Sequence, residues 1–449
     1  MNTARRNARG EASLQRILDA TVQLVGRYGY DNTTIARITK ATQRPASSIY
    51  WFFRDKDELI AAALEHSYTR VARRHRRPWQ QFHPALPVTE QLIGELEPEL
   101  RSSETETPLR LGISLALEGS AASSKVQQPF HRRRAGVLHA IEAWWDGAYA
   151  ATGAAEDVRA APAWWMSTLT LALFDGHYIS DVDAADPPTV AGRSRITALA
   201  LVSAYEAMRA ADPGAFPRHD RAEDNAARNG EYAPPGDGED RAESGPAALL
   251  RVVRGLVAEH GYEGATIGRI CAAADMQRSS VYWRYKDKDT LIEAAVADPF
   301  LALFAPMREL PESGQAWAGD LAAAVGATLR AARHDPDTVK SGLLLKVQQW
   351  DPPTAGGVAV LAGMAALEAE LTAWLRRNAP SGGEGQVPGE HLAWIVLRLV
   401  EGLMFGSVQG RPAPVETVRA LFAVLLAGVA DRWPTVERQA TGAHSSRNR

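Results

Sequence analysis

The chain has 449 residues, of which 45% are hydrophobic and 23% charged, and its formal net charge is −3. This length and composition predict several globular domains with their own cores and exclude a disordered or fibrous protein. The single cysteine excludes an internal disulfide and fits a reducing compartment. The basic first residues precede no apolar run, and the longest apolar run, 421–430, is about half of the ~20 residues that span a bilayer. We therefore expect a cytoplasmic protein without a membrane partner.

Positive charge is concentrated near the start of the chain. Residues 1–77 carry 15 Lys and Arg against 7 Asp and Glu, whereas residues 246–298 carry 7 of each. A local basic excess of this kind is typical of a surface that binds phosphate groups. Between these parts, residues 212–245 are rich in Pro, Gly and acidic residues and show no apolar periodicity, which predicts a flexible linker.

In chain order, the first predicted element is an amphipathic helix over residues 14–28, with apolar residues at helical spacing, and Gly29 is expected to end it. Thr33 and Thr34 are candidate N-caps for a short second helix. A turn at residues 42–44 precedes a third helix over residues 45–53. The first residue of this helix is Pro45, whose fixed φ favours a helix start. Helix, helix, turn and helix is the helix-turn-helix arrangement, whose last helix fits a DNA major groove.

This arrangement occurs twice. Residues 47–60 (SSIYWFFRDKDELI) recur without a gap as residues 279–292 (SSVYWRYKDKDTLI), displaced by 232 positions. A period this long predicts two fused modules and not a solenoid. Downstream of each copy the apolar spacing stays helical and no alternating pattern predicts a sheet, so the predicted fold class is all-α.

Further helices are predicted in both halves, and together with the repeat they divide the chain into seven segments. The predicted helices are 56–77, 88–100, 109–120, 130–151, 162–180 and 188–211, then 320–333, 339–349, 357–378, 391–407 and 415–433. The predicted segments are a basic flexible tail (1–12), a first helix-turn-helix domain (13–63), a first helical domain (64–211), the linker (212–245), a second helix-turn-helix domain (246–297), a second helical domain (298–435) and a flexible tail (436–449).

In both copies the sequence resembles the tetracycline-repressor (TetR) family of bacterial transcription regulators. The matching elements are a Gly-Tyr-Asp/Glu turn, a Thr-Ile-x-Arg-Ile helix, an Ile/Val-Tyr-x-x-Phe/Tyr recognition helix and a Lys-Asp-x-Leu-Ile start of the next helix. The resemblance implies two TetR-like units, each with a DNA-binding module and a helical domain for ligand binding and dimerisation. It also implies that the last two helices of each unit form a four-helix interface.

The resemblance implies two sets of DNA contacts. Phosphate contacts are expected from hydroxyl groups and lysines at helix starts, which suit an anion; these residues are Thr34, Tyr50, Lys56, Thr266, Tyr282 and Lys288. Base contacts are expected from Arg44, Pro45, Ser47, Ser48 and Trp51 in the first copy, and from Gln277, Arg278, Ser279, Ser280 and Trp283 in the second. Alternatively, the two tyrosines belong to the core and the two tryptophans pack against the fourth helix.

The turn before each recognition helix departs from the family pattern. Family members usually have glycine and then an apolar residue, where this chain has Gln43-Arg44 and Asp275-Met276. Asp275 places a negative charge near the surface expected to face DNA. Together with the neutral second module, it predicts weaker DNA binding there.

The helical domains contain many aromatic residues, which are either core or the lining of an effector pocket. The candidate ligand-binding residues are Trp144, Trp145, Trp165, Phe174, Asp175, His177 and Tyr178 in the first half, and Trp350, Trp374, Trp394, Glu401, Met404 and Phe405 in the second. The effector would be flat or hydrophobic, and Asp175 or Glu401 could orient a polar or cationic group.

No enzyme, metal or cofactor motif is present: the sequence has no Gly-rich phosphate loop, no nucleophile elbow and no zinc-binding pair. The sequence therefore predicts a transcription regulator that acts as a repressor and whose partners are a double-stranded DNA operator and a small-molecule effector. The two halves would pair within one chain as a pseudo-dimer. Two alternatives remain: a homodimer that uses only its first helix-turn-helix for DNA, and a ligand-sequestering or protein-binding scaffold with relic modules.

Overall fold

A computed structural model describes residues 2–72, 79–101, 109–118, 124–181, 185–212, 215–216, 246–312, 316–348, 353–379, 381–382 and 385–446. Over these residues the fold is all-α, as predicted, apart from one antiparallel pair of two-residue strands, β1 (Ser381–Gly382) and β2 (Gly385–Gln386). The linker prediction for residues 212–245 falls almost entirely outside the described residues.

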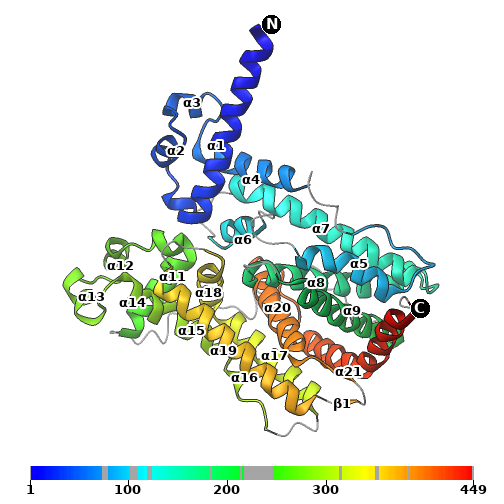
Figure 1. The fold of residues 1–449 in the computed structure, drawn as a ribbon. Helices are drawn as coiled ribbons and strands as arrows, with labels where there is room; N and C mark the ends of the chain where they lie inside the picture. The colour runs from blue at the N-terminus through cyan, green and yellow to red at the C-terminus, as the bar shows by residue number, and fades with distance from the viewer. Residues whose placement is uncertain are drawn as a thin grey trace.

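Two successive sets of helices follow the predicted plan (Figure 1). The first set is α1 (Asn2–Asn32), α2 (Ile35–Thr42), α3 (Ala46–Tyr50), α4 (Lys56–Ala72), α5 (Val88–Arg101), α6 (Leu109–Leu117), α7 (Ser124–Ala150), α8 (Glu156–Ser180) and α9 (Pro187–Ala210). The second set is α11 (Pro246–Gly264), α12 (Ile267–Ala273), α13 (Arg278–Arg284), α14 (Lys288–Ile292), the π-helix η1 (Glu293–Ala297), α15 (Asp298–Ala302), α16 (Ala305–Arg308), α17 (Trp317–His334), α18 (Pro336–Val347), α19 (Ala355–Asn378), α20 (Gly389–Val408) and α21 (Val415–Ser446).

The two predicted terminal tails are helical instead. Helix α1 already begins at Asn2, and α21 continues to Ser446. The structure therefore differs from the predicted flexible tails over residues 2–12 and 436–446. Both segments contain alanine, arginine and glutamate or glutamine, which favour helix, and each prolongs a long amphipathic helix, so no new helix nucleus has to form.

Local sequence explains how each helix-turn-helix module is shaped. Gly29 and Gly261 adopt positive φ angles of 69° and 70° and break α1 and α11 near their ends, a conformation that glycine adopts without strain. The hydroxyl groups of Thr34 and Thr266 then accept the backbone N–H groups of the third residues of α2 and α12, which makes both threonines N-caps. Because the glycine and the threonine cap recur at equivalent positions, the backbone follows the same path in both modules.

The two sets of helices pack together through α8 and α20, which cross at glycines. A Cβ atom added to Gly176 would overlap the backbone carbonyl of Arg398, and one added to Gly402 would overlap the backbone carbonyl of Ala172. Each carbonyl belongs to the residue four positions before the other glycine, so the crossing has local two-fold pseudosymmetry. Helices α9 and α21 also pack against each other. Only glycines at the crossing allow the two backbones to approach this closely.

The helix-turn-helix modules lie at one end of the molecule and α9 and α21 lie at the other (Figure 1). The modules contact each other through the ends of α1 and α11. Arg269 Nη1 lies 3.1 Å from Asp31 Oδ2, and His260 Nδ1 lies 3.4 Å from the same oxygen. Asp31 of the first module thus joins it to the second.

Length and composition alone would let two helices, α19 and α20, cross a membrane. Most of the apolar stretch of α20 (83%) is buried within the protein, as in the core helix of a globular domain, and that of α19 is 33% buried.

Candidate nucleic-acid interface and effector pocket

The recognition helices α3 and α13 expose large aromatic side chains. Trp51 and Trp283 are 78% and 83% exposed, and Tyr50 and Tyr282 are 55% and 50% exposed. In both helices the residue before the tyrosine, Ile49 or Val281, is the buried anchor. The structure thus places these aromatic side chains on the surface and not in the alternative core positions. A flat exposed ring next to a helix end suits contact with nucleic-acid backbone and bases.

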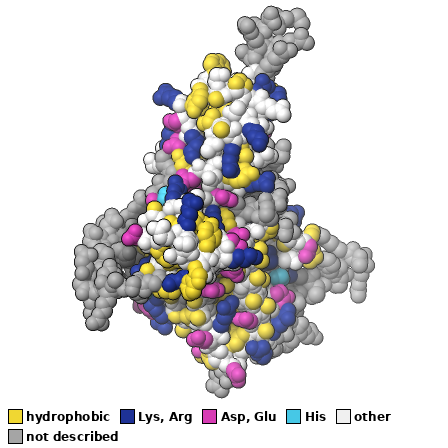
Figure 2. Space-filling view, turned by 90° about the vertical axis from the view of Figure 1, so that its left-hand side faces the viewer, with side chains coloured by type: hydrophobic (Ala, Val, Ile, Leu, Met, Phe, Trp, Pro, Cys, Tyr) yellow, Lys and Arg dark blue, Asp and Glu magenta, His cyan; other side chains and the backbone are white. Residues whose placement is uncertain are grey.

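The other predicted DNA contacts surround these aromatic residues. Residues Thr34, Pro45, Ser47, Thr266, Gln277, Arg278, Ser279 and Ser280 are exposed, and Arg44, Ser48, Lys56 and Lys288 are half-buried. On the face shown in Figure 2, Lys and Arg side chains are interspersed with hydrophobic ones over the upper part of the molecule. Hydroxyl groups, basic groups and exposed rings are thereby brought together at each module, which is a suitable surface for duplex DNA.

Sequence reasoning missed the tyrosines that hold the two lysines. Lys56 Nζ donates to the carbonyl oxygen of Tyr30 over 2.9 Å and lies 3.7 Å from the centroid of its ring. Lys288 Nζ lies 4.2 Å from the Tyr262 ring in the same way. The hydroxyl of Tyr30 donates to Asp57, and the corresponding Tyr262 donates to Asp289. The repeated Gly-Tyr and Lys-Asp pairs were the available signal.

Burial lowers the pKa of Lys56 and of Lys288, because each ammonium group lies against a ring and is partly removed from water. Each lysine therefore fastens the start of the fourth helix to the end of the first. In the arrangement described, its ammonium group is engaged within the protein. A phosphate contact by Lys56 or Lys288 stays a prediction, and it would require the side chain to turn outward.

The unusual turn residues adopt left-handed backbone conformations. Gln43 has φ 52° and Asp275 has φ 48°. This explains why glycine is usual at this position, since an L-residue other than Gly, Asn or Asp is strained there. Gln43→Gly is therefore expected to relieve about 1 kcal/mol of backbone strain in the first module. The greater conformational entropy of glycine in the unfolded chain offsets part of this gain. Thermal unfolding of the chain measures this change, and Asp275→Gly is expected to change stability less because Asp tolerates the conformation better.

Two helix-turn-helix modules that present exposed recognition helices define a DNA-binding transcription regulator. The model of a family described as bacterial regulatory proteins, tetR family, matches residues 17–63 and again residues 249–295. These two matches support a TetR-family regulator with two tandem TetR-like units, unit 1 (α1–α9) and unit 2 (α11–α21). No curated protein matches the chain.

A buried carboxylate lies where the two modules meet the helical domains. Glu118, directly after α6, accepts the Tyr30 N–H over 2.8 Å and the Gln348 side-chain amide over 2.7 Å. Gln348 directly follows α18, the counterpart of α6, so this pair lies near the local two-fold axis. Gly29 and Gly261 pack against it: a Cβ atom at Gly29 would lie 2.7 Å from Glu118 Oε1. Burial raises the pKa of Glu118 to about 7, although its two hydrogen bonds oppose the shift.

Because of Glu118, the free energy of unfolding of the chain is expected to fall as pH rises from about 4.5 to about 7. Over that window the unfolded state releases the Glu118 proton while the folded state retains it. Glu118→Gln, whose amide stays neutral, should remove this contribution, which is on the order of 1–3 kcal/mol. Urea unfolding of both proteins at the two ends of the window measures it. Parallel pH profiles of the two proteins would contradict the assignment.

Unit 1 contains a partly open cavity of about 50 Å³ between α5, α6, α7 and α8. Its lining includes three of the predicted ligand-binding residues, Phe174, Asp175 and Tyr178. Sequence reasoning missed Glu99, Arg133 and Arg134, which come from other helices and carry the remaining polar groups of the lining. Met404 lines a separate cavity of about 10 Å³ in unit 2.

The remaining predicted ligand-binding residues are buried core residues. Trp144 and Trp145 stack edge to face, the Trp145 indole N–H donates to Thr170, and that of Trp374 donates to the carbonyl of Pro311. A buried tryptophan with a satisfied N–H is a packing residue. Trp165 is also fully buried, Phe405 packs against Phe130 of the unit 1 cavity, and Trp350 lies outside the described residues.

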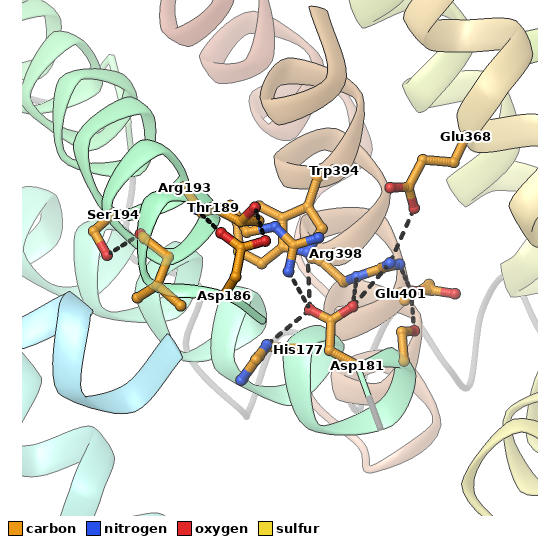
Figure 3. Close-up of polar contacts among 12 residues, drawn as sticks. His177, Asp181, Asp186, Thr189, Arg193, Ser194, Glu368, Trp394, Arg398 and Glu401 are labelled. Atoms are coloured by element: carbon orange, nitrogen blue, oxygen red, sulfur yellow. Dashed lines mark hydrogen bonds and ion pairs between the residues drawn. The ribbon is translucent and has the colours of Figure 1, made fainter. Parts of the chain in front are cut away.

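The structure places His177, Trp394 and Glu401, which were predicted to bind ligand, in an ionic network between the units. Figure 3 shows Asp181, at the end of α8, at the centre of contacts from His177, Arg193, Trp394 and Arg398. Burial alone would raise the pKa of Asp181, but Arg398, His177 and Arg193 together outweigh burial and hold that pKa well below its usual range.

Glu401 continues this network into the core. It is fully buried, accepts from Arg398 Nη1 over 3.0 Å and from Ser180 Oγ over 2.5 Å, and pairs with the buried ammonium of Lys346. Its carboxylate therefore has no free oxygen to offer a ligand. Among the described residues, no group of three or more His, Cys, Asp or Glu is placed to hold a metal ion.

Proposed function

We propose that this regulator works as a covalent pseudo-dimer, in which the two units of one chain pair and present both recognition helices to a single DNA operator. The observation that carries the proposal is the packing of α8 on α20 and of α9 on α21, which leaves α3 and α13 exposed. By analogy with the family, an effector bound in the helical domain would release DNA by changing the relation between the modules. Its site of action is the cytoplasm, where its DNA lies.

The charges at the crossing favour pairing of unlike units. The local two-fold pseudosymmetry of the crossing relates Gly402 to Gly176. At equivalent positions along the two helices, Arg398 corresponds to Ala172 and Asp181 corresponds to Ser407. Two copies of unit 2 would bring buried arginines together without Asp181, and two copies of unit 1 would leave Asp181 without Arg398. Each homotypic pair therefore lacks the buried ion pair between Arg398 and Asp181, which disfavours it relative to the pair within the chain.

Unequal recognition helices support an asymmetric operator. At equivalent positions the first module has Pro45-Ala46 and the second has Gln277-Arg278, and only the second pair can make bidentate contacts with adenine or guanine. Arg278→Ala is expected to weaken operator binding by about 1–3 kcal/mol and to relax sequence preference in one half-site. Competition binding with operators mutated in either half measures this, and Arg376→Ala, on the exposed face of α19, is the matched surface control.

The decisive experiment combines solution mass with a footprint. Light scattering of the chain on DNA selected from a random pool should give one chain per operator, with two unequal protected half-sites. Two chains on a perfect palindrome, with Lys288→Ala harmless and Lys56→Ala disruptive, would instead support the homodimer that uses only its first module. A lack of salt-dependent binding to any DNA would support a scaffold with relic modules.

A further inference from the structure

The unit 1 cavity has a mismatch between its hydrogen-bond donors and acceptors. Its walls are mostly apolar, with Ile113, Phe130, Leu171 and Phe174 among them. Both lining carboxylates already have partners. Arg134 Nη2 donates to Asp175 over 2.5 Å, and the hydroxyl of Tyr178 donates to Glu99 over 2.5 Å. A cationic ligand would therefore have to displace an existing partner from either carboxylate.

Two buried donors, one in the cavity lining and one beside it, lack an acceptor. The Nε of Arg133, which lines the cavity, and the hydroxyl of Tyr68 are buried and have no hydrogen-bond partner among the described residues. They are neighbours, because the Arg133 guanidinium lies 5.1 Å from the centroid of the Tyr68 ring. Arg133 also has no ion pair among the described residues, whereas the adjacent Arg132 pairs with Glu65 over 3.8 Å.

The Tyr68 hydroxyl is a donor under all ordinary conditions. Tyr68 is 4% exposed, and burial raises the pKa of its phenol far above the usual value, so the proton stays on the oxygen. The hydroxyl lies against Gly112 of α6, beside the cavity wall residue Phe130: a Cβ atom at Gly112 would overlap both side chains. Leaving a buried donor without an acceptor costs free energy, so we expect an acceptor at this position.

We propose that the unit 1 cavity binds a small anionic effector, a carboxylic acid with an apolar body whose carboxylate accepts from Arg133 and Tyr68. This inference rests on the proposed function, since it names the effector class of the same regulator. It replaces the expectation of a cationic group at Asp175. The cavity volume of about 50 Å³ corresponds to about three to five water molecules, so the site as it stands fits a short-chain or single-ring acid.

The position of the bound acid would connect it to both the modules and the interface. Tyr68 lies on α4, which begins at Lys56 in the first helix-turn-helix module, and Gly112 lies on α6, which ends at Glu118 beside both modules. On the other side, Phe405 of unit 2 contacts Phe130, and the Arg134 guanidinium lies 5.4 Å from the Phe405 ring. A ligand that moves α4 relative to α6 would therefore change the relation of the two modules.

The test uses the full-length chain and three probes of one size: benzoate, benzyl alcohol and benzylamine. Isothermal titration without DNA should show binding of benzoate and at least about tenfold weaker binding of the other two, because only benzoate supplies a charged acceptor. Arg133→Gln should weaken benzoate binding at least about tenfold. Tyr68→Phe, which removes only the hydroxyl and keeps the packed ring, should weaken it severalfold.

The matched control is Arg132→Gln, which removes an exposed arginine one residue away and should leave benzoate binding unchanged. Benzylamine binding as tightly as benzoate, an Arg133→Gln chain that binds benzoate like the wild type, or no detectable binding of benzoate would each overturn the inference. Binding to selected DNA is measured on the same preparations without acid. If the chain binds DNA but does not respond to acids, only the effector class is rejected. If the chain does not bind the selected DNA even without acid, the proposed function is rejected.

Discussion

Gly402→Ala is expected to destabilise the chain by about 3 kcal/mol or more and to loosen the pairing of the two units. The added Cβ atom would overlap the backbone carbonyl of Ala172 in α8, and no side-chain rotation can relieve an overlap with backbone. Helices α8 and α20 would have to separate, which opens the packed layer on both sides of the crossing. Gly176→Ala, which meets the Arg398 carbonyl, should behave alike. Urea unfolding measures the loss of stability.

Gly406→Ala is the matched control, since it lies one turn further along α20. The atom nearest to its added Cβ is the Arg411 carbonyl oxygen at 3.5 Å, an ordinary contact. Alanine is favoured over glycine inside a helix by about 1 kcal/mol, so this variant should be neutral or slightly stabilised. Equal destabilisation by the two substitutions would show that the close crossing does not hold the units together.

The sequence predicted most helices because their apolar faces are periodic. The predicted range 88–100 became Val88–Arg101, and 391–407 became Gly389–Val408. The double helix-turn-helix was also predictable, because the pattern of residues 47–60 returns at an offset of 232 positions. The glycine, the threonine cap and the buried aliphatic anchor return at the same offset. Local signals of this kind need no knowledge of tertiary contacts.

The partners of buried charged groups could not be predicted. Asp175 and Glu401 occur in similar sequences, Leu-Phe-Asp-Gly and Leu-Val-Glu-Gly, yet Asp175 pairs with Arg134 beside a cavity and Glu401 pairs with Lys346 in the core. The difference comes from α7 and α18, far away in sequence. The recurring glycine after each carboxylate was the stronger signal, because it marks the helix crossing.

The aromatic residues illustrate the same limit. A tryptophan in an apolar helix is either core or pocket lining, and only its neighbours decide. Trp145 and Trp394 have their indole N–H groups satisfied by Thr170 and Asp181, so they fill the core. The polar groups with an unmet donor, Arg133 and Tyr68, carried no sequence signal, because an unsatisfied atom is visible only once the surrounding side chains are placed.

Glu401→Gln is expected to destabilise the chain by about 3–5 kcal/mol, because it leaves a buried ammonium without its counter-charge. Lys346 and Glu401 are 2% and 0% exposed, and the other polar partner of Lys346 is the neutral hydroxyl of Ser180. Arg398 keeps Asp181 and Glu368 at 3.1 and 3.0 Å, so the lost charge falls mainly on Lys346. Urea unfolding of the single variant measures the loss.

The double variant Lys346→Met, Glu401→Gln separates this cause from a general loss of packing. Methionine matches the lysine stem in length and needs no counter-charge, so the double variant should recover at least about half of the stability lost by Glu401→Gln. The exposed pair Arg376 and Glu390 is the reference, because its side chains are 60% and 50% exposed and its removal should cost less than about 1 kcal/mol. If Lys346→Met gave no recovery, the unpaired ammonium would not be the source of the instability.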